Sequence, residues 1–404
     1  MKEIYNHLKV KQAELLKSFD NDFQRDIVDK ISRKEKSIGL IGERGVGKTT
    51  IMLQRIKKTG GFYFSLDDAR FAGTEPATLL KFVEYLYFEL DIRMIYIDEV
   101  HKYNNWRQEI KNIYDGLPKM QVVFSSSSSL SMYQGLADLA RRTDFYTIYP
   151  LNYKEYLKLF RNIEIPDFTI EEIIKNHEKI SLEYASALRQ TDFEDFIKRG
   201  QYPYARKVKD ELYIMKIQNL FDKVVFDDLP MFINLQTDSL DKIRRLLYFI
   251  SHTSPSELTF AGLATKIGIN KNLVENVLTL LHKIGIITLI PKFGNLSDRV
   301  RKEYKMFLGN TNLYNAYNLE TDAGILRECF VASQLKRLRN AELFSPKQGD
   351  IILQIFDKVW NFEIGGKSKK AGKYDENVYI VKDGIELSED ERTIPLWLMG
   401  LIKG

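Results

Sequence analysis

The chain has 404 residues, enough for two to four domains that each bury a core of their own. Apolar residues make up 44% and charged residues 28%, as in an ordinary soluble globular protein and unlike a disordered chain. The formal net charge of +5 is mildly basic, so it permits an anionic partner such as nucleic acid without requiring one.

Cysteine content and apolar runs exclude further classes of protein. Cys329 is the single cysteine, which excludes a disulfide framework within the chain and suits a reducing cytosol. Residues 1–17 mix charged with scattered apolar residues, unlike a signal peptide, and no uncharged apolar run elsewhere reaches the length of a membrane-spanning helix. We therefore expect a cytoplasmic protein with no membrane partner.

Strands alternate with helices over the first 150 residues. Apolar positions at three- and four-residue spacings predict one helix over residues 4–31. Short apolar runs then predict strands, separated by amphipathic helices. The expected strands are 38–41, 62–65, 92–97, 121–124 and 145–149, and the expected helices are 79–90, 106–117 and 131–142. This alternation predicts an α/β domain with a mostly parallel sheet covered on both faces and ligands at the carboxyl ends of its strands.

Residues 42–49 read Gly-Glu-Arg-Gly-Val-Gly-Lys-Thr, the phosphate-binding Walker A pattern, between a predicted strand and a predicted helix. Glycines let successive backbone N–H groups approach phosphate oxygens, and the helix start adds positive potential. Lys48 is predicted to reach the β and γ phosphates and Thr49 to hold Mg²⁺. The expected nucleotide-binding residues are Gly42, Glu43, Arg44, Gly45, Val46, Gly47, Lys48, Thr49 and Thr50.

Asp98 and Glu99 end an apolar strand about fifty residues after the Walker A pattern. We expect Asp98 to hold Mg²⁺ opposite Thr49, and Glu99 to polarise the water that attacks the γ-phosphate. For His101, a hydrogen-bonded structural role is the better interpretation.

Two further groups are candidates for the same site. Ser125 and Ser127 follow the fourth strand, where a hydroxyl could sense the γ-phosphate or orient water; a small flexible loop is the alternative. Arg141 and Arg142 end the next predicted helix, where cations are also favoured by the helix dipole. We favour an arginine finger that reaches a neighbouring subunit's site.

The rest of the chain changes character twice. Residues 151–238 are largely helical and are expected to form a lid or connector. Helices over 243–250, 260–267 and 271–283, followed by a strand at 286–290, have the layout of a winged helix-turn-helix. Modules of this shape also mediate protein contacts, so the layout alone does not decide the partner. The last hundred residues are α/β again, with a helix over 326–339, a hairpin of 351–356 with 359–364, and a strand at 378–381.

The assembled motifs resemble a large prokaryotic family of AAA+-superfamily ATPases, in which an ATPase core is joined to a winged helix and a C-terminal domain resembling PD-(D/E)XK nucleases. The likeness runs over nearly the whole chain, and its segments are 42–49, 98–103, 126–128, 139–142, 150–156, 200–203 and 362–367. The resemblance implies ATP binding and hydrolysis with Mg²⁺ and makes Arg142 a candidate finger. Ser126-Ser127 departs from the Gly-Ser usual in the family's sensor loop.

The nuclease-like fold normally gathers a helix glutamate, a strand aspartate and a Glu-x-Lys around Mg²⁺. The matching residues are Glu328, Asp350 and Glu363, a second metal site. Gly365 stands where the lysine belongs and Lys367 lies two residues further on, about 6–7 Å along a strand. We therefore expect a degenerate or weak nuclease, with three inherited structural carboxylates as the alternative.

Basic and amide side chains make DNA a candidate partner. Glu275, inside the helix that would read the bases, argues against tight contact, and charged runs are also common on solvated surfaces. The groups are Arg299, Arg301, Lys302 and Lys305 after the wing, Lys367, Lys369, Lys370 and Lys373 near the C-terminus, and Asn270, Lys271, Asn272 and Asn276 at the third winged helix.

The expected organisation is an ATPase core (1–150), a helical lid (151–240), a winged helix (241–312) and a nuclease-like domain (313–404). The leading hypothesis is an ATPase that couples its nucleotide state to DNA engagement, acting as a homo-oligomer if the finger works between subunits. One alternative is a nucleotide-dependent switch that gates a protein partner in a stress or defence pathway. The other is a metal-dependent DNA nuclease.

Overall fold

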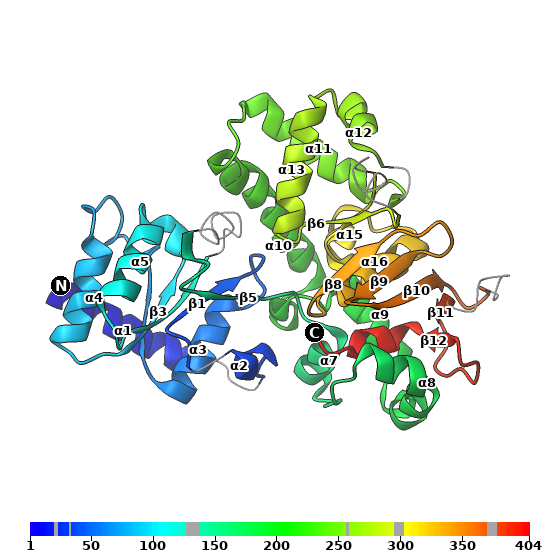
Figure 1. Ribbon diagram of the computed structural model, residues 1–404, viewed down its shortest axis with the longest axis horizontal. Coiled ribbons are helices and arrows are strands. Elements are labelled where there is room, and N and C mark those ends of the chain that lie inside the picture. The colour runs from blue at the N-terminus through cyan, green and yellow to red at the C-terminus, as the bar shows by residue number, and fades with distance from the viewer. Residues whose placement is uncertain (20–22, 32–33, 127–137, 256–257, 295–302, 370–377) are drawn as a thin grey trace. The chain divides into compact units, whose positions relative to one another are not determined.

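The computed structural model describes residues 1–404 except 20–22, 32–33, 127–137, 256–257, 295–302 and 370–377 (Figure 1). The chain divides into two compact units, Met1–Pro150 and Leu151–Gly404. Each unit has a β-sheet of its own, so each is considered by itself.

The first unit is built on a parallel sheet with the strand order β2-β3-β4-β1-β5 among the described residues. Strand β4 lies between β1 and β3, with Leu40 paired to Ser125 and Ile97 paired to Phe124. The carboxyl ends of these three strands therefore meet at one edge of the sheet. The strands are β1 (Ser37–Ile41), β2 (Phe62–Ser65), β3 (Met94–Asp98), β4 (Gln121–Ser125) and β5 (Asp144–Thr147), which confirms the predicted α/β class and the parallel sheet.

The helices of this unit fall close to their predicted positions, with one exception. The single helix predicted over residues 4–31 is wrong, because Phe19 ends α1 with extended backbone (φ −76°, ψ 116°) and α2 is a separate short helix. Of the predicted helix 131–142, residues 131–137 lie outside the described residues and Arg142 lies in a turn. The helices are α1 (Lys2–Ser18), α2 (Ile27–Lys30), α3 (Lys48–Thr59), α4 (Thr78–Phe88) and α5 (Trp106–Gly116).

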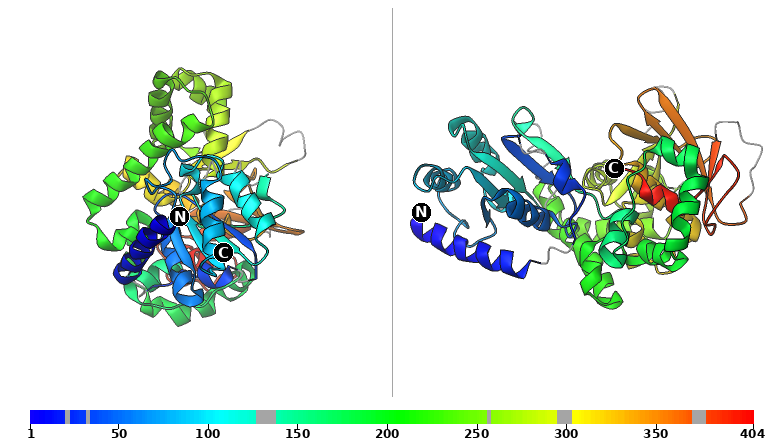
Figure 2. Two further views of the ribbon diagram at one scale, coloured as in Figure 1. Left: turned by 90° about the vertical axis from the view of Figure 1, so that its left-hand side faces the viewer. Right: turned by 90° about the horizontal axis from the view of Figure 1, so that it is seen from below.

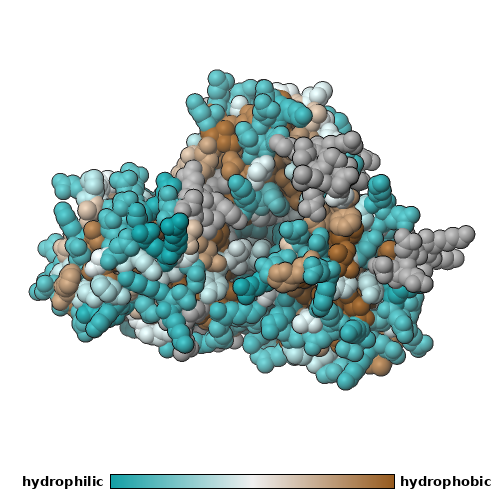
Figure 3. Space-filling view, viewed as in Figure 1, coloured by the Kyte–Doolittle hydropathy of each residue, from teal (hydrophilic) through white to brown (hydrophobic). Residues whose placement is uncertain are grey.

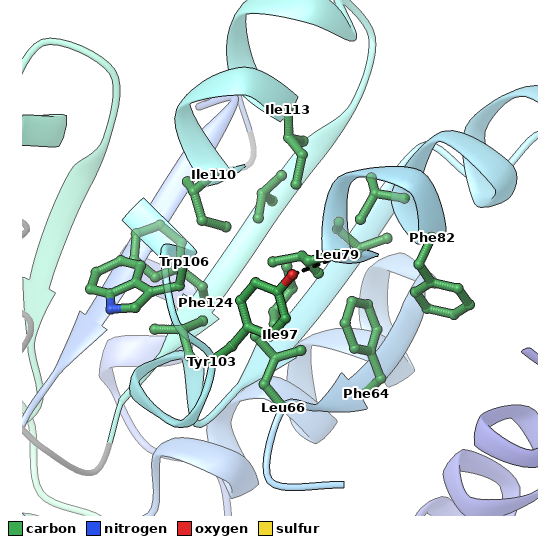
Figure 4. Close-up of a cluster of buried hydrophobic side chains, with 14 of the residues drawn as sticks. Phe64, Leu66, Leu79, Phe82, Ile97, Tyr103, Trp106, Ile110, Ile113 and Phe124 are labelled. Carbon is green, nitrogen blue, oxygen red and sulfur yellow. Dashed lines mark hydrogen bonds between the residues drawn. The ribbon is translucent and has the colours of Figure 1, made fainter. Parts of the chain in front are cut away.

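An aromatic core fixes strands β2, β3 and β4 against α4 and α5 (Figure 4). The rings of Phe64 and Phe82 meet edge to face at 5.3 Å, and Trp106 lies 5.8 Å from Phe124. Burying each such side chain contributes about 1.5–3 kcal/mol. Tyr96 alternates with the core residues of β3, and its hydroxyl lies 2.8 Å from Thr59 Oγ1 at the end of α3. The residues of β3 on that second face therefore point toward α3, as does Asp98 at the end of the strand.

The second unit begins with helices, as predicted for residues 151–238. Asn152 and Glu155 form a capping box that starts α7. Figure 2 shows these helices from two further sides. The main elements are α7 (Tyr153–Tyr156), α8 (Ile170–Tyr184), α9 (Gln190–Arg199) and α10 (Asp210–Lys223).

Three helices and an antiparallel strand pair follow; the helices and the first strand lie close to their predicted positions, whereas the second strand was not predicted. They are α11 (Thr237–Ser251), α12 (Phe260–Ile267), α13 (Lys271–Lys283), β6 (Ile287–Pro291) and β7 (Tyr304–Leu308). Gly268 ends α12 in the left-handed region (φ 73°), and the Asn270 side chain accepts a hydrogen bond from Asn272 N–H to start α13. Strand β6 pairs with β7, with Ile287 opposite Leu308.

The second unit ends in a mixed sheet with the order β12-β11-β10-β9-β8 in the described part of the chain. Strands β8, β9 and β10 are antiparallel neighbours, whereas β10, β11 and β12 are parallel. Sequence patterns predicted β9, β10 and β11 but missed the short β8 and β12. The elements are α15 (Thr311–Tyr317), α16 (Ala323–Leu335), β8 (Ala341–Phe344), β9 (Ile351–Ile355), β10 (Lys358–Gly365), β11 (Val378–Lys382) and β12 (Thr393–Pro395).

The surface is mainly hydrophilic, with apolar side chains scattered between charged ones on the face shown in Figure 3. Phe356 and Val359, at the tip of the β9–β10 hairpin, are exposed to 73% and 49%. No helix in the described ranges has both the length and the apolar character needed to cross a bilayer.

Candidate active site

The loop after β1 has the backbone that a phosphate cradle needs. A Cβ on Gly42 would lie 2.3 Å from the carbonyl oxygen of Ile148, so a larger residue does not fit there. Gly45 and Gly47 have φ values of 81° and 97°, which glycine adopts at little cost. The loop therefore turns tightly and leads directly into α3, whose first residue is Lys48.

Lys48 is folded back over this loop. Its Nζ donates hydrogen bonds to the carbonyl oxygens of Gly42 (2.7 Å) and Glu43 (2.8 Å), and only 6% of the residue is exposed. Burial lowers the pKa of Lys48 to about 8, while Glu99 and Asp98 act in the opposite direction. The ammonium group is thus already held at the loop that would carry the phosphates.

The rest of the predicted nucleotide-binding segment lies in the same turn. Glu43 and Val46 are buried, Arg44 is half-buried, and Thr50 lies in the first turn of α3 beside Thr49.

Asp98, at the end of β3, is the centre of a hydroxyl network. Its Oδ2 accepts hydrogen bonds from the hydroxyls of Thr49 (2.5 Å) and Tyr63 (3.1 Å). Its Oδ1 accepts from the Ser125 hydroxyl and from the Glu99 N–H (3.1 Å). Burial and the Asp98 carboxylate raise the pKa of Tyr63 well above its ordinary value, so this hydroxyl stays a donor. The carboxylate is 3% exposed and is oriented by neutral groups.

Glu99 follows Asp98 with left-handed backbone (φ 55°, ψ 43°). Its Oε2 lies 3.2 Å from Nδ1 of His101, and the Ser126 hydroxyl lies 3.0 Å from the same nitrogen. Burial, together with the nearby Arg44, Lys102 and Lys48, lowers the pKa of His101 to about 3, so the ring is neutral at neutral pH. His101 is hydrogen-bonded, as expected from the sequence.

Sequence reasoning missed two residues that shape the site. Tyr63 reaches Asp98 from β2, and Arg25 donates to the carbonyls of Val46 and Tyr149, both at 2.9 Å. The alternation of β2 contained a signal for Tyr63, because it faces away from its phenylalanine neighbours in the Phe62–Ser65 strand. The sequence holds no comparable pattern for Arg25, because this residue precedes the motif and its partners are backbone carbonyl groups, which any residue type provides.

One predicted catalytic residue, Arg142, has its described contacts away from Asp98. Arg142 forms a two-pronged ion pair with Asp115 on α5, with Nε to Oδ1 at 2.9 Å and the second nitrogen to Oδ2 at 3.1 Å. Ser127 lies outside the described residues. Ser125, the other serine candidate, is buried at Asp98.

In the second unit, lysines lie among the three predicted carboxylates. Lys305 Nζ, from β7, is 2.6 Å from Glu328 Oε2 and 3.4 Å from Asp350 Oδ1, and Lys369 pairs with Glu363. Burial raises the pKa of Glu328, and Lys305 opposes that shift. These lysines, rather than Lys367, neutralise the carboxylates.

Asp350 is further fixed by the Ile364 N–H, which donates to its Oδ2 at 2.8 Å. Within the described ranges, no group of three or more His, Cys, Asp or Glu side chains is placed to hold a metal ion. The second metal site, at Glu328, Asp350 and Glu363, stays a prediction that this arrangement does not favour.

Parts of the chain match known families. Residues 34–157 match the model of an AAA domain, AAA_14, and residues 190–324 match a domain of unknown function, DUF8612. The Uncharacterized protein MJ1637 of Methanocaldococcus jannaschii is 28% identical over 308 residues, which cover 72% of this chain and 64% of that protein. The chain thus spans less than two thirds of the length of this relative.

Solved structures overlap with the chain only loosely. The Walker-type ATPase PABY2304 of Pyrococcus abyssi has a TM-score of 0.44 and 10% identity, covering 73% of this chain and 95% of that one. The ORC1 protein of Aeropyrum pernix in complex with DNA has a TM-score of 0.28 and 13% identity, covering 78% and 92%. Scores below 0.5 do not establish a common fold. Residues 34–157 thus match an AAA domain, and the same segment carries the glycine loop and the parallel sheet of a P-loop fold.

Proposed function

We propose that the protein binds and hydrolyses ATP with Mg²⁺ in its first unit. One observation carries the proposal: the Thr49 hydroxyl and the Asp98 carboxylate lie 2.5 Å apart beside the Lys48 ammonium. Oxygen donors of this kind suit Mg²⁺, which prefers one or two protein oxygens together with phosphate oxygens and water. A loop that admits no Cβ at Gly42 also fits a phosphate held by backbone N–H groups.

Each residue then has a distinct role. Lys48 would exchange its two carbonyl partners for the β and γ phosphates, and Thr49 and Asp98 would hold Mg²⁺. Bound Mg²⁺ supplies charge neutralisation for the phosphate oxygens. Glu99 orients the attacking water and accepts its proton. Tyr63 and Ser125 keep the Asp98 carboxylate in the orientation that the metal requires.

Arg142 keeps its proposed role as a finger between subunits of a homo-oligomer. Its side chain would first have to leave Asp115, which lies in the same subunit. Asp115 is exposed and Arg142 is half-buried, so solvent screens the pair and such an exchange costs little free energy.

We further propose that the second unit engages DNA through α11–α13 and β6–β7 as a winged helix. Support comes from the exposed face of α13, which carries Lys271, Asn272 and Asn276, amide and ammonium groups of the kind that contact bases and phosphates. Asn270 is instead used as the helix cap, so it is removed from this set. The basic residues Arg299, Arg301 and Lys302 lie outside the described residues.

ATP turnover in the presence of duplex, single-stranded and branched DNA tests the coupling. We expect stimulation by at least one form, with binding that weakens as salt is raised. Asn276→Ala and Lys271→Ala should reduce the stimulation and leave the turnover without DNA unchanged. Turnover indifferent to every DNA, together with a nucleotide-dependent change of oligomeric state, would instead favour the switch that gates a protein partner.

A further inference from the structure

The side chain of His101 bridges two segments of the proposed active site. Its Nδ1 lies 3.2 Å from Glu99 Oε2 and 3.0 Å from Ser126 Oγ, and 2% of the side chain is exposed. One buried ring nitrogen therefore joins the residue after β3 to the residue after β4.

The backbone of Glu99 has a conformation that is uncommon for a residue with a side chain. Left-handed φ and ψ angles are uncommon for a residue with a Cβ and often occur at functional sites. Glu99 starts the short 3-10 helix Val100–Lys102, and His101 is the middle residue of that helix. The strained backbone points the glutamate side chain toward the histidine ring, and the Glu99 side chain remains 26% exposed. Its carboxylate is thus directed by a side-chain contact while it stays accessible to water.

The protonation of the ring determines how Nδ1 can interact with the Glu99 carboxylate that lies 3.2 Å from it. The pKa of His101 lies far below neutrality, so the ring carries one hydrogen at neutral pH. An ionised carboxylate can only accept, so the contact with Glu99 requires that hydrogen on Nδ1. With the hydrogen on Nδ1, the Ser126 oxygen is an acceptor of that same hydrogen.

We propose that His101 is a positioning residue for Glu99, holding its carboxylate at the angle that activates water and linking it to Ser126 at the end of β4. This inference rests on the proposed ATPase function. In the reaction, the water oxygen bonds to the γ-phosphorus while the bond from that phosphorus to the oxygen bridging it to the β-phosphate breaks and ADP leaves. One water proton passes to Glu99, and the imidazole neither gains nor loses a proton.

Three substitutions separate this role from a structural one. His101→Asn places an amide N–H close to the position of Nδ1, His101→Gln moves the amide further out, and His101→Leu fills the space without a donor. For His101→Leu we expect kcat to fall at least about tenfold, because small errors in positioning a catalytic group are costly. KM and the affinity for a fluorescent ATP analogue should stay within about twofold, and His101→Asn should recover most of the loss while His101→Gln should not.

A double-variant cycle with Glu99→Gln gives the decisive readout. If His101 acts through Glu99, His101→Leu slows single-turnover hydrolysis in the wild type but has no further effect in Glu99→Gln. Equal effects in both backgrounds, or equal losses for the Asn and Leu variants, would overturn the inference. If the Leu variant does not fold, the contrast between the Asn and Gln variants carries the test in its place. Absence of turnover in the wild type would overturn the ATPase proposal itself, which makes the two failures distinguishable.

Discussion

The two carboxylate centres of this molecule are held by opposite kinds of neighbour. Asp98 accepts hydrogen bonds from the hydroxyls of Thr49 and Tyr63, which are neutral, whereas Glu328 and Asp350 face the ammonium group of Lys305. Hydroxyls orient a carboxylate and leave its charge in place, while an ammonium group cancels that charge. The two carboxylate centres therefore differ in their nearest cation. Lys48 acts on Asp98 through space and forms its hydrogen bonds with backbone carbonyls, whereas Lys305 pairs directly with Glu328 and Asp350.

The largest effect expected at the hydroxyl-held centre comes from Glu99→Gln. The amide cannot accept the proton from water, so turnover should fall by a factor on the order of 10²–10³ while ATP binding remains. Phosphate release and equilibrium nucleotide binding measure the two properties. Glu89→Gln, at the exposed end of α4, is the control and should match the wild type in both. A Glu99→Gln rate close to that of the wild type would remove Glu99 from the mechanism.

Lys305→Met tests the lysine-held centre. Breaking a largely buried ion pair leaves Glu328 without its partner, so the free energy of unfolding should fall by about 3 kcal/mol. Chemical denaturation measures the change. Lys292→Met, which breaks an exposed pair with Glu303 just beyond the end of the same strand pair, should cost less than about 1 kcal/mol. Equal, small effects of the two substitutions would contradict the assignment of Lys305 as the internal cation.

The cost of Lys305→Met should also depend on pH. Burial already raises the pKa of Glu328 in the folded protein, and loss of Lys305 raises it further. A raised folded pKa gives stability that is fully present below the unfolded pKa of about 4.3 and is lost as pH rises through the folded value. The variant should therefore be nearest to the wild type in acid and furthest from it at neutral pH. A stability difference that is constant with pH would contradict this prediction.

Tyr63→Phe should have a smaller effect on the hydroxyl-held centre. It removes one donor to Asp98, which should cost about 1 kcal/mol of stability and reduce Mg²⁺-dependent turnover by about two- to tenfold. Tyr96→Phe is a matched control, since it deletes another buried hydroxyl bond on the same face, to Thr59, without touching Asp98. Only Tyr63→Phe should change the Mg²⁺ concentration needed for half-maximal turnover. An equal change in both variants would show that loss of either tyrosine hydroxyl alters the Mg²⁺ requirement, and it would contradict a specific role for the bond from Tyr63 to Asp98.

The smallest structural effect is expected at the pair of Arg142 with Asp115. The pair is largely exposed, so Asp115→Asn should leave the unfolding transition unchanged within error. Arg142→Ala should lower turnover only at protein concentrations where subunits associate, and Arg141→Ala should not. Turnover of Arg142→Ala that equals the wild type at every concentration would end its proposed role as a finger.

The sequence predicted the parts of the first centre that are contiguous. Glycine spacing in the loop after β1 and the Asp98-Glu99 pair after an apolar strand are local patterns with a direct physical reason, and the alternation of strands and helices predicted the sheet that brings them together. Ser125 was visible as a candidate because β4 ends there. Its position beside Asp98 depended on the strand order, which places β4 between β1 and β3.

The residues that the sequence did not reveal lie far along the chain from the carboxylates that they contact. The pairing register of the strands brings them there. Tyr63 lies 35 residues before Asp98. It reaches Asp98 because of the face of β2 on which it lies, and its residue type alone does not reveal that face. Lys305 appeared only as one member of a basic cluster, because the pairing of β6 with β7 that directs it toward Glu328 leaves no local signature. The helix predicted over 4–31 failed because apolar spacing continues past Phe19, where the backbone becomes extended.

Equilibrium binding of radiolabelled ATP, with and without Mg²⁺, tests the central claim most directly. We expect the wild type to bind ATP more tightly with Mg²⁺ than without it, and Lys48→Ala to bind at least about tenfold more weakly because a buried phosphate-facing ammonium group is lost. Lys58→Ala, on the exposed side of α3, should bind like the wild type. Wild-type protein that retains no ATP under either condition, or Lys48→Ala that binds as tightly as the wild type, would contradict the account.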